Sequence, residues 1–408
     1  MAVNPAQVKP ADAIPLIEIN DQGEKGSEIL AVNHDALKIL RGIDSNIKVS
    51  VVCVCGIYRS GKSSLMNWLL DIDTWTEKKY GFEVGPSVNR CTRGIWMWGA
   101  PKKSKLPSGE ECYVIVLDTE GIGGVESNAQ YDARIFSLAL LLCSSLIYNS
   151  MGSIDEAAIS NLSFVAQLSQ HIHLTQPPQP QEQSKENGKC QHDESSMFSK
   201  IFPSFTWVVR DFILDLKDDD GDDITSLQYL NSALQPKKGF DKVTVERNRV
   251  RSMLSSFFAR RQCVTMVRPC NDEVALQQVN NIPFEELRPE FQNSMQELRK
   301  LIFRNLSPKS MHGKNLNGIM FAGLIESYVS TINNGGVPTV ATAWDDVSEK
   351  ECIHALDVAV QMYEESMDKS CADMPLSADE LNNAHEDALM VAMQFFESRA
   401  VGKKAGKR

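Results

Sequence analysis

Short apolar runs alternate with stretches of helical apolar spacing along most of the chain, and this alternation predicts an α/β fold. Continuous apolar or β-branched runs, which favour buried strands, lie at residues 49–54, 95–98, 112–117, 145–148, 205–209 and 262–267. Helical spacing is found at residues 63–70, from residue 131 onward and at 155–172, and Asn33 is placed to cap an earlier helix. Strands that alternate with helices indicate a mostly parallel, doubly wound sheet, which we place at residues 15–305.

The pattern changes after Pro308. Residues 315–333, 346–370 and 378–399 have helical apolar spacing, and no strand-like alternation remains. We therefore expect a separate helical region at residues 306–400, followed by a basic tail at 401–408.

Three polar stretches are expected to lie outside the regular elements. Residues 1–14 are rich in Ala and Pro and predict a flexible N-terminus, which leads into a short edge strand at 15–19. Residues 102–108 read as a basic loop. The segment at about 175–197 is rich in Pro, Gln, Glu and Ser, a composition typical of a disordered surface loop.

One motif stands between the first central strand and its helix. Residues 56–63 fit the spacing G-x-x-x-x-G-K-[ST], which describes a loop that cradles phosphate groups. Gly56 and Gly61 would let the backbone wrap the phosphates, with N–H groups and a helix N-terminus facing the charge. Lys62 would reach the β- and γ-phosphates, and the Ser63 hydroxyl would bind Mg²⁺. The sequence therefore predicts a nucleotide site.

Further candidates follow other predicted strands. Asp118 ends the apolar run at 112–117 and could hold Mg²⁺, while Gly121 leaves room for a backbone N–H near the γ-phosphate. Thr92 lies in a polar connection and is a candidate for a hydroxyl that closes on the metal. Arg59, inside the loop motif, could reach developing phosphoryl charge.

The identity of the base is the harder question, because the guanine-reading pattern Asn-Lys-x-Asp is absent from the chain. A guanine site still needs one carboxylate to accept hydrogen bonds from the ring N–H and the exocyclic amine. Adenine lacks this donor pair, so the same carboxylate rejects it. Asp211, at the end of a late strand, is placed for this role, and an ATP-dependent enzyme remains the alternative.

Composition narrows the class of partner and the compartment. The net charge of −11 over 408 residues argues against nucleic acid as the main partner. Ten scattered cysteines without metal-site spacing fit free thiols in a reducing compartment. There is no secretory signal, and the longest apolar stretch, at 135–148, is too short to span a bilayer. We expect a cytoplasmic protein, with peripheral membrane contact unsupported.

The motifs, in this order, resemble the guanylate-binding proteins, large GTPases of the dynamin superfamily. The residues that carry the resemblance are Gly-Ile-Tyr-Arg-Ser-Gly-Lys-Ser at 56–63, Thr-Arg-Gly-Ile-Trp-Met-Trp at 92–98, Asp-Thr-Glu-Gly at 118–121, Val-Arg-Asp-Phe at 209–212 and Val-Arg-Pro at 267–269. The resemblance implies a phosphate-loop NTPase of the large G-domain type over residues 15–305, with the start of a helical middle domain after it.

What the resemblance implies is GTP hydrolysis to GDP, or onward to GMP, with Mg²⁺ and with nucleotide-dependent homodimerisation through the G domain. By this match the catalytic residues are Arg59 as an internal arginine finger, Lys62, the switch threonine Thr92, and Glu120. Mg²⁺ would be held by Ser63, Thr92 and Asp118. The nucleotide would be bound by Gly56, Tyr58, Arg59, Ser60, Gly61, Lys62, Ser63, Ser64, Asp118, Gly121, Arg210, Asp211, Val267 and Arg268.

Three departures from the family pattern matter. Arg90 stands where well-known members have a Ser that helps to place the attacking water, and the loop at 176–196 is longer than usual. The long C-terminal helices and the lipidation box of some members are missing, which is expected of either a short member or a truncated chain. The alternative to an enzyme is a nucleotide-gated scaffold in which Arg90 has weakened hydrolysis.

Overall fold

A mostly parallel sheet forms the centre of the computed structural model, which describes residues 12–20, 29–70, 81–84, 93–122, 129–162, 202–372 and 376–400. Within these residues nine strands form one sheet. Eight of them pair in the order β2-β1-β4-β6-β3-β7-β8-β9, and the ninth, β5, pairs with β6 outside this order. The strands are β1 (Ala13–Asn20), β2 (Ile29–Val32), β3 (Lys48–Gly56), β4 (Ile95–Trp98), β5 (Lys102–Lys105), β6 (Glu111–Thr119), β7 (Ser145–Met151), β8 (Ser204–Arg210) and β9 (Arg261–Thr265).

The pairing of β3 explains why the predicted site residues share one edge of the sheet. β3 runs parallel to β6 and β7, and β8 and β9 continue the parallel part. In this register Val54 lies opposite Asp118, and Gly56 lies opposite Asn149. The carboxyl ends of these strands therefore meet at one edge, where ligands bind in open α/β sheets.

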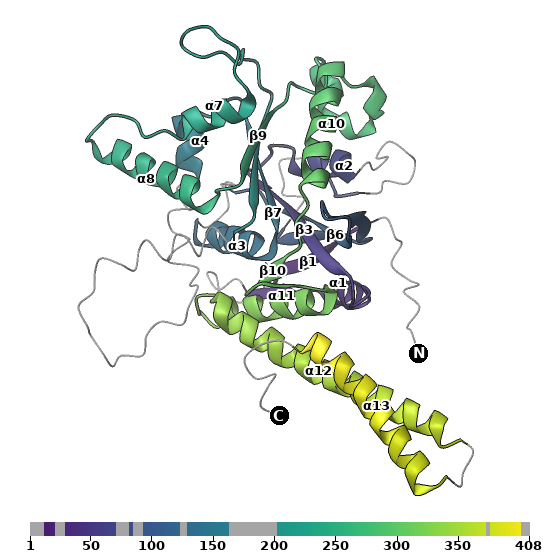
Figure 1. Cartoon of the computed structure of the whole chain (residues 1–408). Coiled ribbons are helices and arrows are strands. Elements are labelled where there is room, and N and C mark those ends of the chain that lie inside the picture. The colour runs from purple at the N-terminus through teal and green to yellow at the C-terminus, as the bar shows by residue number, and fades with distance from the viewer. Residues whose placement is uncertain are drawn as a thin grey trace, which may run out of the picture.

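Helices cover both faces of the sheet (Figure 1). Alternate residues of β3 divide between two cores: Val51 and Cys53 pack in the core that includes α1, α3 and α11, and Val52 and Val54 in the core that includes α2 and α10. The helices of the sheet domain are α1 (His34–Arg41), α2 (Lys62–Leu70), α3 (Ala129–Leu142), α4 (Glu156–Asn161), α7 (Ser226–Ala233), α8 (Lys242–Phe257), α9 (Glu273–Gln277) and α10 (Pro289–Arg304). Asn33 caps α1 as predicted, and its side chain accepts from two backbone N–H groups.

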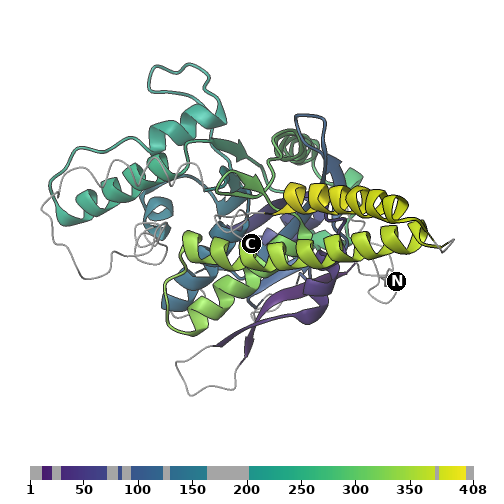
Figure 2. The ribbon, with the colours of Figure 1, turned by 60° about the horizontal axis from the view of Figure 1, so that its bottom comes forward.

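The C-terminal region consists of α11 (Gly318–Asn333), α12 (Val340–Ser370) and α13 (Ala378–Arg399). α12 and α13 lie side by side as a hairpin in both views, and in Figure 1 the hairpin projects away from the sheet (Figures 1 and 2). At the end of α13, Arg399 donates hydrogen bonds to Ser45 and Asn46 in the connection between α1 and β3. This contact joins the return helix to the sheet domain. Over the described ranges, no helix combines the length and the apolar character that crossing a lipid bilayer requires.

Several sequence expectations need correction. β1 is not an edge strand, because it pairs with β2 on one side and β4 on the other. The predicted basic loop at 102–108 begins with β5, which is a strand because it pairs with β6 and not because of its own composition. A small hairpin of β10 (Ser310–Met311) and β11 (Lys314–Asn315) lies in the region expected to be wholly helical. The predicted loop at 175–197 and the basic tail lie outside the described residues.

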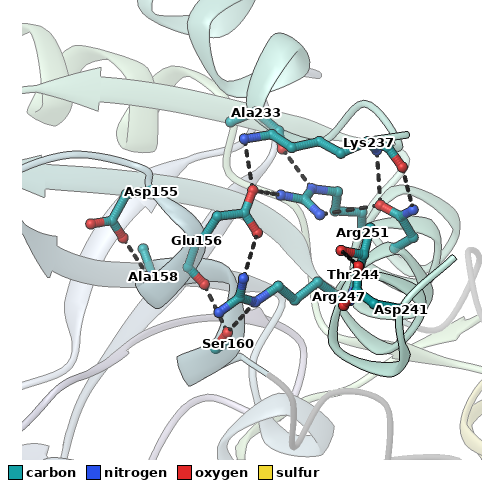
Figure 3. A network of polar contacts seen from close by, with 11 residues as sticks. Asp155, Glu156, Ala158, Ser160, Ala233, Lys237, Asp241, Thr244, Arg247 and Arg251 are labelled. Carbon is teal, nitrogen blue, oxygen red and sulfur yellow. Dashed lines mark hydrogen bonds and ion pairs between the residues drawn. The ribbon is translucent and has the colours of Figure 1, made fainter. Parts of the chain in front are cut away.

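An ion network with one buried arginine joins α8 to α4 (Figure 3). Glu156, in the first turn of α4, contacts Lys237, Arg247 and Arg251. The Arg251 side chain is only 2% exposed, and it also donates to the Ala233 carbonyl at 3.1 Å and to Asn248 Oδ1 at 3.2 Å. Arg251 thus satisfies acceptors from three segments at once.

Replacing Arg251 with Met should lower the free energy of unfolding by about 2–3 kcal/mol, because buried acceptors then lose their donors. Lys237→Met is the matched control. It removes a cation from the same carboxylate, but Lys237 is 60% exposed, so its loss should cost less than about 1 kcal/mol. Urea denaturation of both variants measures the difference, and equal losses would contradict the central role of Arg251.

Candidate functional site

The loop between β3 and α2 has the backbone shape that the motif predicts. Gly56 has φ of +151°, and a Cβ there would lie 2.0 Å from the Asn149 carbonyl oxygen, so only glycine fits. Gly61 has φ of +76°, and Arg59 has φ of +62° although it is not a glycine. A left-handed arginine stores strain of about 1–2 kcal/mol, which is common at functional loops.

Asn149, near the end of β7, forms hydrogen bonds with the phosphate loop. Its Nδ2 donates to the Ser60 carbonyl at 2.7 Å and to Ser60 Oγ at 2.9 Å. Ser60 Oγ in turn donates to the Ile57 carbonyl at 2.7 Å. No role was assigned to Asn149 from the sequence. Its place directly after the apolar run at 145–148 is the signal that could have indicated one.

The residues predicted to hold phosphate and metal meet at the start of α2. Ser63 Oγ donates to Asp118 Oδ2 at 2.5 Å, and Lys62 Nζ donates to the Ile57 carbonyl at 3.2 Å. Burial lowers the pKa of the Lys62 ammonium, and the nearby Asp118 carboxylate opposes the shift. The structure thus brings Lys62, Ser63 and Asp118 together at the start of α2.

Gly121 lies directly over the loop. A Cβ at this position would lie 2.4 Å from the Tyr58 Cα and 3.0 Å from Lys62 Nζ. Tyr58 also donates its backbone N–H to the Ile122 carbonyl. A side chain at position 121 would thus push the loop and the Asp118 strand apart.

Glu120 is buried and faces away from Ser63 toward α3 and β4. Its Oε2 accepts from the Tyr131 hydroxyl at 2.8 Å and from the Gly94 backbone N–H at 3.1 Å. In this arrangement Glu120 ties the end of β6 to the start of β4, just after the segment that contains Thr92. Thr92 and Arg90 themselves lie outside the described residues.

The predicted base-reading residues form a second group along the same edge. Asp211 has φ of +55°, and its Oδ2 lies 3.2 Å from Arg268 Nε. Arg268 also lies 3.6 Å from Glu273, in α9. Val267 is half-buried against the core shared with α2 and α10. The structure thus brings Asp211, Val267 and Arg268 together.

Arg210 connects this group to the phosphate loop. Its Nη1 donates to the Gly61 carbonyl at 3.4 Å, and burial lowers its pKa to about 10. Of the other predicted contacts, Ser64 is buried in the first turn of α2, and the Arg59 guanidinium lies 5.5 Å from the centroid of the Tyr58 ring.

This arrangement suits a polyphosphate anion with a divalent ion. In the described part of the chain, no group of three or more His, Cys, Asp or Glu side chains is placed to hold a metal by itself. The Ser63 hydroxyl and the Asp118 carboxylate are hard oxygen donors, which Mg²⁺ prefers when phosphate oxygens complete its shell. These residues fit the ion.

Comparison with known proteins agrees with the geometry. The family described as guanylate-binding protein, N-terminal domain, matches residues 27–311, and the guanylate-binding protein, C-terminal domain, matches residues 312–407.

Among curated proteins, the chain is similar to guanylate-binding protein 1 of Chlorocebus aethiops, with 35% identity over 90% of this chain and 59% of that protein. Guanylate-binding protein 2 of Homo sapiens has 34% identity over 90% of this chain and 58% of its own length. Guanylate-binding protein 7 of Mus musculus has 36% identity over 84% of this chain and 51% of its own length. The chain thus spans between half and three fifths of the length of these relatives. With both family domains matched over nearly its whole length, the chain belongs to the guanylate-binding protein family.

Proposed function

We propose that this protein binds GTP with Mg²⁺ and hydrolyses it to GDP, with dimerisation through the nucleotide face of the sheet domain. The observation that carries the proposal is the convergence of three groups at one sheet edge. The phosphate loop follows β3, Asp118 ends β6, and Asp211 follows β8. A phosphoryl-transfer site needs a phosphate cradle, a metal carboxylate and a base reader, and these three groups supply them.

Each chain residue then has a distinct task. The loop N–H groups and Lys62 would bind the phosphates, and Ser63 and Asp118 would hold Mg²⁺, which when bound would neutralise charge on the phosphates. The Thr92 hydroxyl would be a further ligand of the metal, and Arg59 would stabilise the charge that develops during transfer. Asp211 accepts hydrogen bonds from guanine. Glu120 holds the end of β6, and thereby Asp118 and Gly121, in place.

Turnover measured across a range of protein concentrations tests the proposal. An enzyme that is activated by dimerisation shows phosphate release per molecule that rises with concentration. A nucleotide-gated scaffold binds GTP without releasing phosphate, and that outcome would overturn the assignment as an enzyme. Resolving GDP from GMP among the products identifies the end point.

Replacing Asp211 with Asn should reduce GTP affinity by about tenfold to a hundredfold, because a hydrogen bond to a charged acceptor contributes about 1.5–3 kcal/mol. ATP affinity should change little, so the ratio of GTP affinity to ATP affinity should fall. Competition titrations with both nucleotides measure this ratio. Asp215→Asn, an exposed carboxylate in the connection that follows β8, is the matched control. An unchanged GTP-to-ATP ratio in Asp211→Asn would favour an ATP-dependent enzyme.

A further inference from the structure

The Arg210 guanidinium lies beside a pair of touching aromatic rings that come from distant parts of the chain. Its central carbon lies 5.5 Å from the ring centroid of Trp68 in α2 and 5.6 Å from that of Phe291 in α10. The two rings also contact each other edge to face, with centroids 4.9 Å apart. Both aromatic side chains are buried. Attraction between a cation and an aromatic face is strongest when water is excluded, as it is here.

The polar contacts of Arg210 are sparse for a buried charge. Nη1 donates to the Gly61 carbonyl at 3.4 Å, and Nε is buried with no hydrogen-bond partner among the described residues. The neighbouring Asp211 carboxylate favours the charged guanidinium from a distance, but its ion pair is with Arg268. With a pKa of about 10, the guanidinium is charged at neutral pH. A buried cation without a bonded carboxylate is costly, so its retention calls for another source of negative charge.

The position of this charge indicates what that source is. Gly61 directly precedes α2, and a Cβ on Gly61 would lie 3.3 Å from Arg210 Nη1. The N-terminus of a helix carries a partial positive charge, and Lys62 adds a full one. Arg210 and Lys62 therefore both lie at the turn of backbone that opens α2. A polyphosphate bound in the loop would supply the negative charge that Arg210 lacks.

We propose that Trp68 and Phe291 are positioning residues for nucleotide binding: they hold the Arg210 charge against the phosphate loop, where it stabilises the β- and γ-phosphates. The inference rests on the proposed guanine-nucleotide function and adds to it two residues outside the phosphate-loop and base-reading motifs. Phe291 lies in α10, the helix that follows the segment containing Arg268. By this inference α10 also helps to position Arg210 at the phosphate loop.

The test compares the affinities of Trp68→Leu and Trp68→Phe for GTP, GDP and GMP. Trp68→Leu removes the aromatic face and should weaken GTP and GDP binding about tenfold. Its effect on GMP, which lacks the β- and γ-phosphates, should stay below about threefold. Trp68→Phe keeps an aromatic face and should restore most of the GTP affinity. Trp344→Leu is the matched control, since Trp344 is also a buried tryptophan but lies in α12.

The outcomes separate the inference from the proposed function. Equal losses for GTP, GDP and GMP, or a Trp68→Phe protein as weak as Trp68→Leu, would mean that Trp68 only fills space, and the inference would be wrong. A wild-type chain that binds none of the three nucleotides would overturn the proposed function itself. Thermal unfolding without nucleotide establishes that each variant is folded. If Trp68→Leu does not fold, Phe291→Leu removes the second ring beside the guanidinium and allows the same comparison.

Discussion

Replacing Lys62 with Ala should raise the Kd for GTP by on the order of a hundredfold or more. The ammonium is buried at the start of α2, and its hydrogen bond to the Ile57 carbonyl holds it within the loop. Each charge-assisted hydrogen bond to a phosphate contributes about 1.5–3 kcal/mol, and Lys62 is placed to make two. Titration with a fluorescent guanine nucleotide measures the loss.

The folding of this variant needs its own measurement. Burial disfavours the Lys62 charge and lowers its pKa, while the buried Asp118 and Glu120 carboxylates oppose that shift. Thermal unfolding without nucleotide establishes that the variant is folded. Lys103→Ala, an exposed lysine in β5, controls for the loss of one positive charge. GTP affinity within threefold of the wild-type value in Lys62→Ala would show that residues 56–63 are not a phosphate loop.

The central strands could be predicted from the sequence because both of their faces are buried. β3 is buried from Val49 to Gly56, so its residues form a continuous apolar run that needs no knowledge of its neighbours. β5 has the sequence Lys-Lys-Ser-Lys and carries no such signal. Its residues form a strand through pairing with β6, as where Lys102 lies opposite Val114. The signal for this strand therefore lies in the sequence of β6 and not in that of β5.

In the candidate site, too, local features could be predicted from the sequence and contacts between distant elements could not. The phosphate loop is a local feature whose glycines, lysine and serine lie within eight positions, so spacing alone indicates it. The packing of Arg210 beside the touching rings of Trp68 and Phe291 joins three elements that are remote in sequence. An aromatic residue at helical spacing is ordinarily part of a core, and only the fold shows that these two face a cation.

The contact of Arg399 with Ser45 also joins residues that are remote in sequence, and it could not be predicted. Arg399 ends a helix that is amphipathic by itself, and Ser45 lies in an ordinary polar connection. Neither position carries a pattern that points to the other. Their meeting depends on the length of α12 and on the return of α13, which brings the end of the hairpin back to the sheet domain.

The side chain of Arg59 starts from a position that suits an arginine finger. Its backbone is left-handed, with φ of +62°, in the middle of the phosphate loop. The guanidinium lies over the Tyr58 ring, and the residue is exposed. The proposed role of Arg59 requires this side chain to turn from the ring toward the γ-phosphate.

Replacing Arg59 with Ala should accordingly slow GTP hydrolysis by about a hundredfold or more, while the Kd for GTP changes only a few-fold. An arginine finger stabilises charge that develops in the transition state and contributes about 10³–10⁵ in rate. Single-turnover phosphate release, with nucleotide affinity measured in parallel, separates the two effects. Arg59→Lys keeps the positive charge but loses the planar pair of donors, so it should recover little of the rate. Alanine has a Cβ like arginine and leaves the left-handed backbone under the same strain, so a loss of rate reports on the guanidinium and not on a rearranged loop. Turnover equal to that of the wild type would remove Arg59 from the mechanism and leave Lys62 and Mg²⁺ to stabilise the transferred charge.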